Sequence, residues 1–325
     1  MTRNLLAAVV ATASLCAVAL PAAAQGYPSK PVRLVVPFPP GGGTDFFART
    51  VGAMMSDTLG QPVVVDNRPG GSTIIGAENV KTSPPDGYTV LLGDLGTYAL
   101  NPSLFKKLPY DPATDFAPVT LTGRFVLAIA VNPAALNVNS IQEFIDAAKK
   151  APGKIAYASP GTGSPHQLAM ELFAREAGIK LLHVPYKGAA PALQDLIGGQ
   201  VPVMMVDLAA GQASIKGGKI KVLGTATPSP VAALPGVPTI ASAGLPGFEA
   251  WAWQGFSVPK GTQPEVISRL REGYVQAIAD PAVRAKLVEA GIEPLQSTPQ
   301  EMASYVSAET AKWSKVIRDA NISLD

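Results

Sequence analysis

The hydrophobic positions of the chain follow two recurring patterns, short apolar runs and longer stretches with helical spacing. The first run, residues 32–36, is rich in β-branched residues and is typical of a buried strand. In residues 46–59 the apolar positions recur every three to four residues, which predicts an amphipathic helix. A glycine-rich segment, residues 37–45, joins the two, so residues 32–59 are predicted to form a strand, a loop and a helix.

The same alternation continues along the rest of the chain. Further strands are predicted at residues 63–65, 88–92, 125–131, 154–158, 181–184, 201–206, 220–223 and 251–258. Helices are predicted at residues 74–81, 140–150, 164–177 and 191–197, and two more begin at the capping boxes near residues 262 and 298. Strands that alternate with helices in this way indicate an α/β protein.

The loop Pro37-Phe38-Pro39-Pro40-Gly41-Gly42-Gly43-Thr44-Asp45 is the most informative segment. Its three glycines allow a tight turn and the close approach of a ligand to the main chain. The helix that follows directs its free N–H groups and the positive end of its dipole at the loop. These features predict an anion site, and a plain flexible turn is the alternative.

The loop does not match the common phosphate motifs. A nucleotide P-loop needs Lys followed by Ser or Thr after its last glycine, where this chain has Thr44 and Asp45. The dinucleotide motif needs a third glycine at the position of Phe46. Since Asp45 would also oppose a highly charged phosphate, a single carboxylate is the anion that the loop favours.

A second strand–loop–helix unit follows roughly 120 residues later. Its loop is Ser159-Pro160-Gly161-Thr162-Gly163, and its helix opens with the capping box Ser164-Pro165-His166-Gln167. The separation is too long for a tandem motif of one domain. We therefore expect two domains that face each other, each supplying one helix N-terminus.

The domain boundaries follow from this arrangement. The apolar run 251–258 is expected to re-enter the first domain after a Pro- and Gly-rich connection at 235–246. Domain 1 is therefore predicted to contain residues 25–124 plus 250–325, and domain 2 residues 125–249. Hinge motion is expected near residues 123–124 and 249–251.

Residues 1–24 have the pattern of a secretory signal peptide, with Arg3, an apolar run and Ala22-Ala23-Ala24 before Gln25. The only cysteine, Cys16, lies in this segment. Cleavage after Ala24 would leave about 300 residues without disulfides, enough for two domains. The chain has a formal net charge of +2 and its basic residues are scattered, so nucleic acid is not an expected partner.

An enzyme is the rival class, and the sequence gives it little support. His166 and His183 are the only histidines, and no Gly-x-Ser-x-Gly elbow is present. Ser103 and Lys106 fit a Ser-x-x-Lys pattern whose two partner motifs are missing. Two histidines without a mature cysteine argue against zinc. We therefore expect no catalytic residue, no metal and no cofactor.

Several motifs together resemble the Bug receptors, the extracytoplasmic solute-binding proteins of tripartite tricarboxylate transporters. The motifs are Tyr27-Pro28-Ser29-Lys30-Pro31, the segment 35–45, Asn67-Arg68-Pro69-Gly70, Pro85-Asp86-Gly87-Tyr88, Leu108-Pro109-Tyr110-Asp111, His183-Val184-Pro185-Tyr186-Lys187-Gly188 and Leu234-Pro235-Gly236-Val237-Pro238-Thr239. They span essentially the whole mature chain in order.

The resemblance implies a periplasmic binding protein with two domains (type II-like), each a mixed sheet flanked by helices, with two crossovers. It implies a small organic acid as ligand, with one carboxylate held between residues 41–45 and residues 159–164. The residues expected at the ligand are Phe38, Pro40, Gly41, Gly42, Gly43, Thr44, Asp45, Asp94, Thr97, Ser159, Gly161, Thr162, Gly163, Ser164, His166, Tyr186 and Asp207.

The resemblance also implies the partners of the protein, and the sequence departs from the family pattern at one position. The receptor is expected to be a periplasmic monomer that delivers its ligand to the membrane subunits of a transporter. An alternative is that it presents the ligand to a sensor histidine kinase. Asp94 stands where the family often has small polar residues. A carboxylate there could recognise an ammonium or hydroxyl group, or disfavour a second ligand carboxylate.

Overall fold

The computed structural model describes residues 26–319 and 322–324. The expected signal peptide, residues 1–24, lies outside the described residues. The strands are β1 (Val32–Val36), β2 (Val63–Asn67), β3 (Thr89–Asp94), β4 (Phe116–Val131), β5 (Ala156–Ser159), β6 (Leu182–Pro185), β7 (Val203–Asp207), β8 (Lys221–Thr225), β9 (Trp251–Pro259) and β10 (Ile292–Pro294). The helices are α2 (Gly43–Leu59), α3 (Ile74–Lys81), the π-helical turn η1 (Gly96–Leu100), α4 (Asn101–Leu104), α5 (Ile141–Lys150), α6 (Pro165–Glu176), α7 (Ala189–Ile197), α8 (Leu208–Lys216), α9 (Pro264–Ala279), α10 (Pro281–Glu289) and α11 (Pro299–Asp319).

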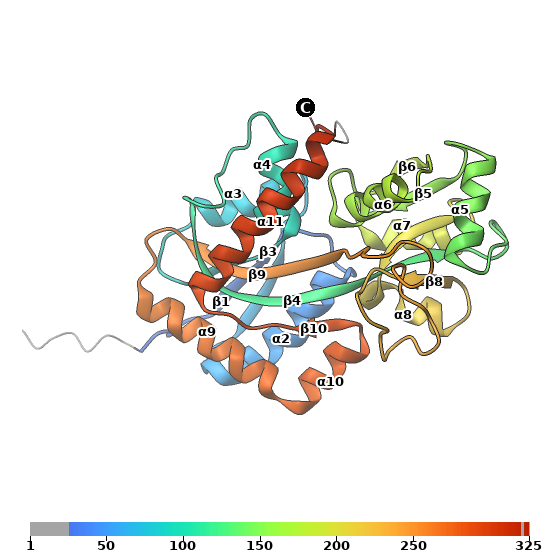
Figure 1. The fold of residues 1–325 in the computed structure, drawn as a ribbon. Helices are drawn as coiled ribbons and strands as arrows, with labels where there is room; N and C mark the ends of the chain where they lie inside the picture. Colours follow the sequence, from blue (N-terminus) through green and yellow to red (C-terminus); the bar gives the residue numbers. More distant parts are fainter. Residues whose placement is uncertain (1–25, 320–321, 325) are drawn as a thin grey trace, which may run out of the picture.

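The strands form two mixed sheets, one in each lobe of the molecule (Figure 1). In the first lobe the order is β2-β1-β3-β9-β4, with β10 on the outer side of β4. β1 is parallel to β2 and β3, whereas β9 is antiparallel to β3 and β4. In the second lobe the order is β4-β7-β5-β6, and β8 also pairs with β4. The periplasmic binding protein architecture is therefore present.

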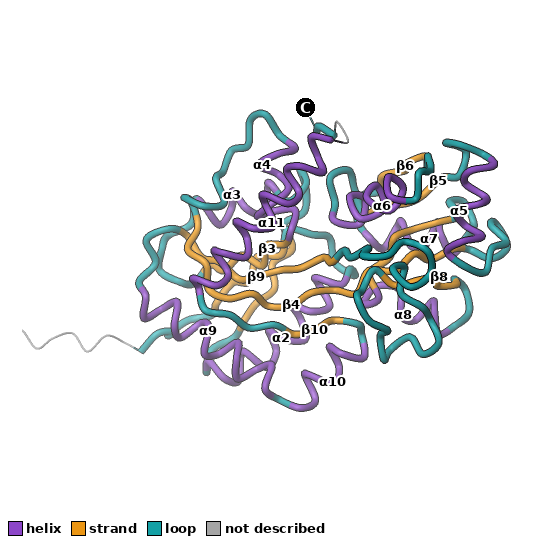
Figure 2. The backbone as a smooth tube through the Cα atoms, viewed as in Figure 1, coloured by secondary structure: helices purple, strands orange, loops and turns teal. Residues whose placement is uncertain are grey.

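β4 is the strand that both sheets share. Residues 116–126 pair with β9, and residues 127–131 pair with β7. The sequence predicted a strand only at 125–131, so its first nine residues were missed. Thr120, Thr122 and Pro118 interrupt the apolar pattern there, and two register shifts bend this part of the strand. β9 returns the chain to the first lobe, which gives the two expected crossovers (Figure 2).

Helices cover both faces of the first sheet. On α2 the apolar positions predicted to face the core are buried, among them Phe47, Val51 and Met55, and this helix packs against α9. On the opposite face α11 buries Trp313 beside Trp253 of β9, and both indole nitrogens donate to the same Glu309 carboxylate oxygen. Across residues 26–319 and 322–324, no helix is long and apolar enough to cross a membrane.

Four helical elements were not predicted, namely η1, α4, α8 and α10, and the two longer ones each have a local reason. α8 is short and rich in alanine and glycine, so its apolar positions show no clear period. α10 follows α9 directly, and Asp280 caps it by accepting hydrogen bonds from the N–H groups of Ala282 and Val283, both at 2.9 Å. The predicted helix at 74–81 coincides with α3.

Candidate ligand-binding site

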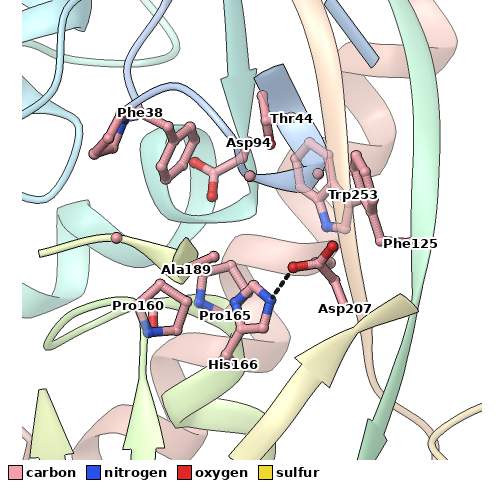
Figure 3. Close-up of a pocket in the computed structure, with 16 residues that line it drawn as sticks. Phe38, Thr44, Asp94, Phe125, Pro160, Pro165, His166, Ala189, Asp207 and Trp253 are labelled. Carbon is pink, nitrogen blue, oxygen red and sulfur yellow. Dashed lines mark hydrogen bonds and ion pairs between the residues drawn. The ribbon is translucent and has the colours of Figure 1, made fainter. Parts of the chain in front are cut away.

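A cavity of about 60 Å³ lies between the two lobes (Figure 3). A volume of this size has room for several water molecules, since roughly 10–15 Å³ admits one. Its lining residues come from both lobes and are Phe38, Pro39, Gly42, Gly43, Thr44, Asp94, Phe125, Pro160, Ser164, Pro165, His166, Gly188, Ala189, Asp207, Ala252 and Trp253.

Four helices begin at this cavity, and two of them are capped by their own side chains. Ser164 Oγ accepts a hydrogen bond from the N–H of Gln167 at 3.3 Å and caps α6. Asp207 Oδ1 accepts one from the N–H of Ala210 at 2.8 Å and caps α8. These side chains satisfy first-turn N–H groups that would otherwise be free.

The other two helices, α2 and α7, begin with glycine. Their N-cap residues are Gly42 and Gly188, and within the described chain neither helix has a side-chain hydrogen bond at its cap. The two ends meet across the lobes, because a Cβ atom built on Gly42 would lie 3.8 Å from the Ala189 Cβ atom. Two uncapped helix N-termini thus converge at the cavity, and such ends attract anions.

Asp45 shapes the glycine loop from outside the cavity. Its Oδ2 accepts hydrogen bonds from the Gly41 N–H at 3.1 Å and from Arg49 Nε at 3.0 Å, while Oδ1 accepts one from Asn67 at 3.0 Å. Burial alone would raise the pKa of Asp45, but these hydrogen bonds outweigh it and lower the pKa. The carboxylate is therefore already satisfied, and it lines a neighbouring groove together with Gly41.

Asp94 ends β3 and directs its carboxyl group into the cavity (Figure 3). Its Oδ1 accepts hydrogen bonds from the N–H and the hydroxyl of Thr97, both at 2.8 Å. The side chain is buried, and this burial raises the pKa of Asp94 despite the hydrogen bonds from Thr97. Thr97 Oγ1 also lies 3.0 Å from Thr73 Oγ1, so a buried polar network supports the carboxyl from behind.

His166 and Asp207 form a pair on the opposite wall. His166 Nε2 lies 3.3 Å from Asp207 Oδ2, the interaction drawn in Figure 3. His166 Nδ1 is buried and has no hydrogen-bond partner within the described residues. In the part of the chain that the structure describes, no group of three or more His, Cys, Asp or Glu side chains is placed to hold a metal ion.

The second predicted loop contributes less to the cavity than expected. Ser159 is completely buried, and its Oγ lies 2.6 Å from His183 Nε2. Burial lowers the pKa of His183 to about 4, so the imidazole is neutral at physiological pH. The Tyr186 hydroxyl donates to Asp195 at 2.7 Å and not to the cavity.

The predicted site residues thus fall into two groups. The structure brings together at the cavity Phe38, Gly42, Gly43, Thr44, Asp94, Ser164, His166 and Asp207. The residues that do not line it are Pro40, Gly41, Asp45, Thr97, Ser159, Gly161, Thr162, Gly163 and Tyr186. That any of these residues contacts a ligand stays a prediction.

The sequence interpretation missed several lining residues. They are Pro39, Phe125, Pro160, Pro165, Gly188, Ala189, Ala252 and Trp253. A signal for the start of α7 was present, since Gly188 precedes the helix and Pro191 stands in its first turn, where prolines are tolerated. Phe125 and Trp253 sit where β4 and β9 cross between the lobes, and a strand pattern does not identify such positions.

The lobes are in contact around the cavity. A Cβ atom built on Gly43 would lie 2.5 Å from Asp207 Oδ1 and 3.1 Å from the Phe125 ring. At the rim, the Ser72 hydroxyl donates to the Thr162 carbonyl at 3.2 Å. The structure therefore shows the two lobes closed on each other.

Known proteins share this fold and sequence over almost their full lengths. The chain is 35% identical to BugT of Bordetella pertussis over 325 residues, covering 100% of this chain and 99% of that protein. Among solved structures, Rpa4515 of R. palustris with adipate has 38% identity and a TM-score of 0.88, covering 91% of this chain and 99% of that one. MatC of Rhodopseudomonas palustris with bound malate has 32% identity and a TM-score of 0.84, covering 90% and 100%.

The family model for the tripartite tricarboxylate transporter family receptor matches residues 47–322. The match begins just after the glycine loop and continues into the residues that follow α11. The resemblance to Bug receptors seen in the sequence is therefore confirmed. The chain belongs to the receptor family of the tripartite tricarboxylate transporters.

Proposed function

We propose that the protein is a periplasmic receptor that captures a small organic carboxylate between its lobes and delivers it to the membrane subunits of a transporter. The observation that carries this proposal is the pair of uncapped helices, α2 and α7, which begin at one cavity from opposite lobes. The adipate and malate of two relatives are small carboxylates as well.

The free energy available at such a site is adequate for a receptor. Each helix N-terminus contributes about 0.3–1 kcal/mol to anion binding, and up to ~2 kcal/mol when it is partly buried. Each charge-assisted hydrogen bond from a main-chain N–H adds about 1.5–3 kcal/mol. After the cost of association, three or four such bonds support roughly micromolar affinity without an arginine.

The proposal includes closure by hinge motion about β4 and β9. We place domain 1 at residues 25–124 plus 250–325 and domain 2 at residues 125–249. The pairing of β4 supports these boundaries, because it changes from β9 to β7 between Val126 and Leu127. The ligand would close the lobes by contacting α2 on one side and α7 on the other.

A receptor role fits the Ser159–His183 pair better than catalysis does. The 2.6 Å separation is that of a nucleophile and its base. However, Ser159 is completely buried and lies outside the cavity lining, so a substrate in the cavity would not reach its hydroxyl. We therefore assign the pair to the support of the β5–α6 loop, and the protein to a class without enzymatic activity.

Thermal-shift measurements test the proposal directly. The mature protein, proposed to begin at Gln25 and to be monomeric, would be screened against mono-, di- and tricarboxylates, aromatic acids and amino acids. A ligand at about 100 times its dissociation constant adds about 2.7 kcal/mol of stability, a shift of several degrees. A flat response to every acid would contradict the proposal.

Gene deletion tests the partner. Loss of uptake of the bound acid would support delivery to a transporter. Loss of gene induction with intact uptake would instead assign the protein to a sensor kinase. Size-exclusion chromatography with light scattering would report whether the mature chain is a monomer.

A further inference from the structure

The cavity has an unusual charge for a site that receives an acid. Two carboxyl groups, those of Asp94 and Asp207, line it together with the imidazole of His166. Among the described residues that line the cavity there is no lysine or arginine. Arg49, at the back of the glycine loop, lies in a neighbouring groove and is paired with Asp45 at 3.0 Å. The lining therefore offers more negative than positive charge.

The carboxyl group of Asp207 is already held by other parts of the second lobe. Its Oδ1 caps α8, where the helix dipole stabilises a negative charge, and its Oδ2 lies 3.3 Å from His166 Nε2. Both oxygens therefore have partners within the protein.

Asp94 has no comparable compensation. It forms no ion pair among the described residues, and its carboxyl group accepts hydrogen bonds only from the turn after β3, two from Thr97 to Oδ1 and one from the Gly96 main chain. An asparagine could accept the same two hydrogen bonds through its own Oδ1 without burying an acid. Capping of the turn after β3 therefore explains a polar side chain at position 94, but not an acidic one. A buried acid that faces a cavity favours a cationic partner there.

Aromatic side chains around Asp94 favour the same partner. Phe38, Phe125 and Trp253 line the cavity, with Phe38 on one side of Asp94 and the other two rings on the other side in the view of Figure 3. The faces of aromatic rings attract cations. The Trp253 ring is fully buried and already stacks on Tyr98, so this attraction would come from the two phenylalanines. They offer no hydrogen bond that would replace the hydration of a second ligand carboxylate.

We propose that the ligand of this protein is a zwitterion, with one carboxylate at the N-termini of α2 and α7 and one ammonium group at Asp94. This inference rests on the proposed function and specifies its ligand class. It separates the protein from the relatives whose structures contain adipate and malate, which are dicarboxylates. A second ligand carboxylate would meet Asp94 as a like charge in a buried site.

Isothermal titration calorimetry on the wild-type mature protein tests the inference with acids that share a carbon skeleton. The four-carbon set is butyrate, succinate and 2-, 3- and 4-aminobutyrate, and the six-carbon set is hexanoate, adipate and 2- and 6-aminohexanoate. Moving the ammonium group along the chain covers the unknown distance between the two binding points. At least one amino acid should bind about tenfold or more tightly than the unsubstituted acid and the diacid of the same length.

The substitution Asp94→Asn assigns that preference to the proposed residue. It should lower the affinity for the amino acid to that of the unsubstituted acid and leave or improve the affinity for the diacid. Asp280→Asn is the matched control, because Asp280 also accepts two hydrogen bonds at a helix start but lies outside the cavity lining. This control should retain the wild-type ranking.

The outcomes separate this inference from the function on which it rests. Wild-type protein that binds succinate or adipate more tightly than every amino acid would overturn the zwitterion and leave the carboxylate receptor intact. Unchanged amino acid affinity in Asp94→Asn would also overturn it. If none of the acids binds, both the inference and the proposed function are contradicted. The wild-type ranking decides the matter even if the variant does not fold.

Discussion

Gly43 lies at a close contact between the two lobes. It is the first residue of α2, and its backbone lies against the Asp207 carboxylate and the Phe125 ring. A side chain at this position would separate the lobes or displace the cap of α8. The requirement for glycine here therefore comes from space across the cleft.

We predict that Gly43→Ala weakens ligand binding. The added Cβ would lie 2.5 Å from Asp207 Oδ1, and overpacking of this kind costs about 1–3 kcal/mol, or roughly 5- to 150-fold in affinity. Titration with an acid that stabilises the wild-type protein measures the change.

Gly52→Ala on the same helix is the matched control. Its Cβ would meet Val63 Cγ1 at 3.5 Å, an ordinary contact, and alanine within a helix adds about 0.5–1 kcal/mol of stability. This variant should bind like wild type and melt at the same or a higher temperature. Equal affinity of Gly43→Ala and Gly52→Ala would show that contact at Gly43 is not part of the bound state.

At the scale of elements, the sequence predicted what is decided locally. α2 and α3 were predicted because a glycine-rich loop precedes each of them, and α2 also has apolar residues at helical spacing. The strands β1 and β7 were predicted from apolar runs, because buried strands need no polar face. β4 was predicted only in part, because its first half is stabilised by pairing with β9, which is distant in the sequence.

The site shows the same limit. Glycines before a helix indicated the α2 end of the cavity, and α6 was expected to provide the other end. α6 does begin at the cavity, but Ser164 caps it as predicted, and the uncapped helix opposite α2 is α7, which was not predicted as part of the site. Which helix faces α2 depends on how the lobes meet. A side-chain cap also uses first-turn N–H groups, so a capped helix offers fewer of them to a ligand than its motif suggests.

His183 of β6, which pairs with Ser159 of β5, predicts a pH dependence of stability. The folded-state pKa of His183 is about 4, because burial disfavours the charged imidazole, whereas the unfolded value is 6.5. Between these values the unfolded chain binds a proton that the folded chain does not. The free energy of unfolding should therefore fall as the pH decreases from above 6.5 toward about 4.

Thermal unfolding at pH 7.5 and pH 5.0 measures this effect. His183→Gln removes the titrating group, so its melting temperature should fall less than that of wild type between the two values. Ser159→Ala is the control: it removes the hydrogen bond at 2.6 Å but leaves His183 in place, and the pH dependence should persist because burial is its cause. Identical pH dependence in wild type and His183→Gln would refute the assignment.

At the scale of the whole molecule, Leu324 contacts both lobes of the closed cleft. The Leu324 N–H donates to the Leu104 carbonyl of the first lobe at 2.9 Å. A Cβ atom built on Gly163 of the second lobe would lie 2.7 Å from Leu324 Cδ1, so the leucine side chain also touches that lobe. Contacts that exist only when the lobes meet shift the equilibrium toward closure, and ligand affinity shifts with them.

Leu324→Ala should therefore favour the open form. We expect a larger radius of gyration than wild type in small-angle X-ray scattering without ligand, the same radius with saturating ligand, and affinity lowered about two- to fivefold, because only the closed fraction is fully competent to bind. Leu182→Ala is the control. It is the same leucine-to-alanine change at a residue of β6 that is 53% exposed and lies outside the cavity lining. In the variant, the ligand must supply the closure free energy that the Leu324 contacts no longer provide. A variant with wild-type affinity and wild-type radius of gyration would mean that the contacts of Leu324 accompany closure without contributing to it.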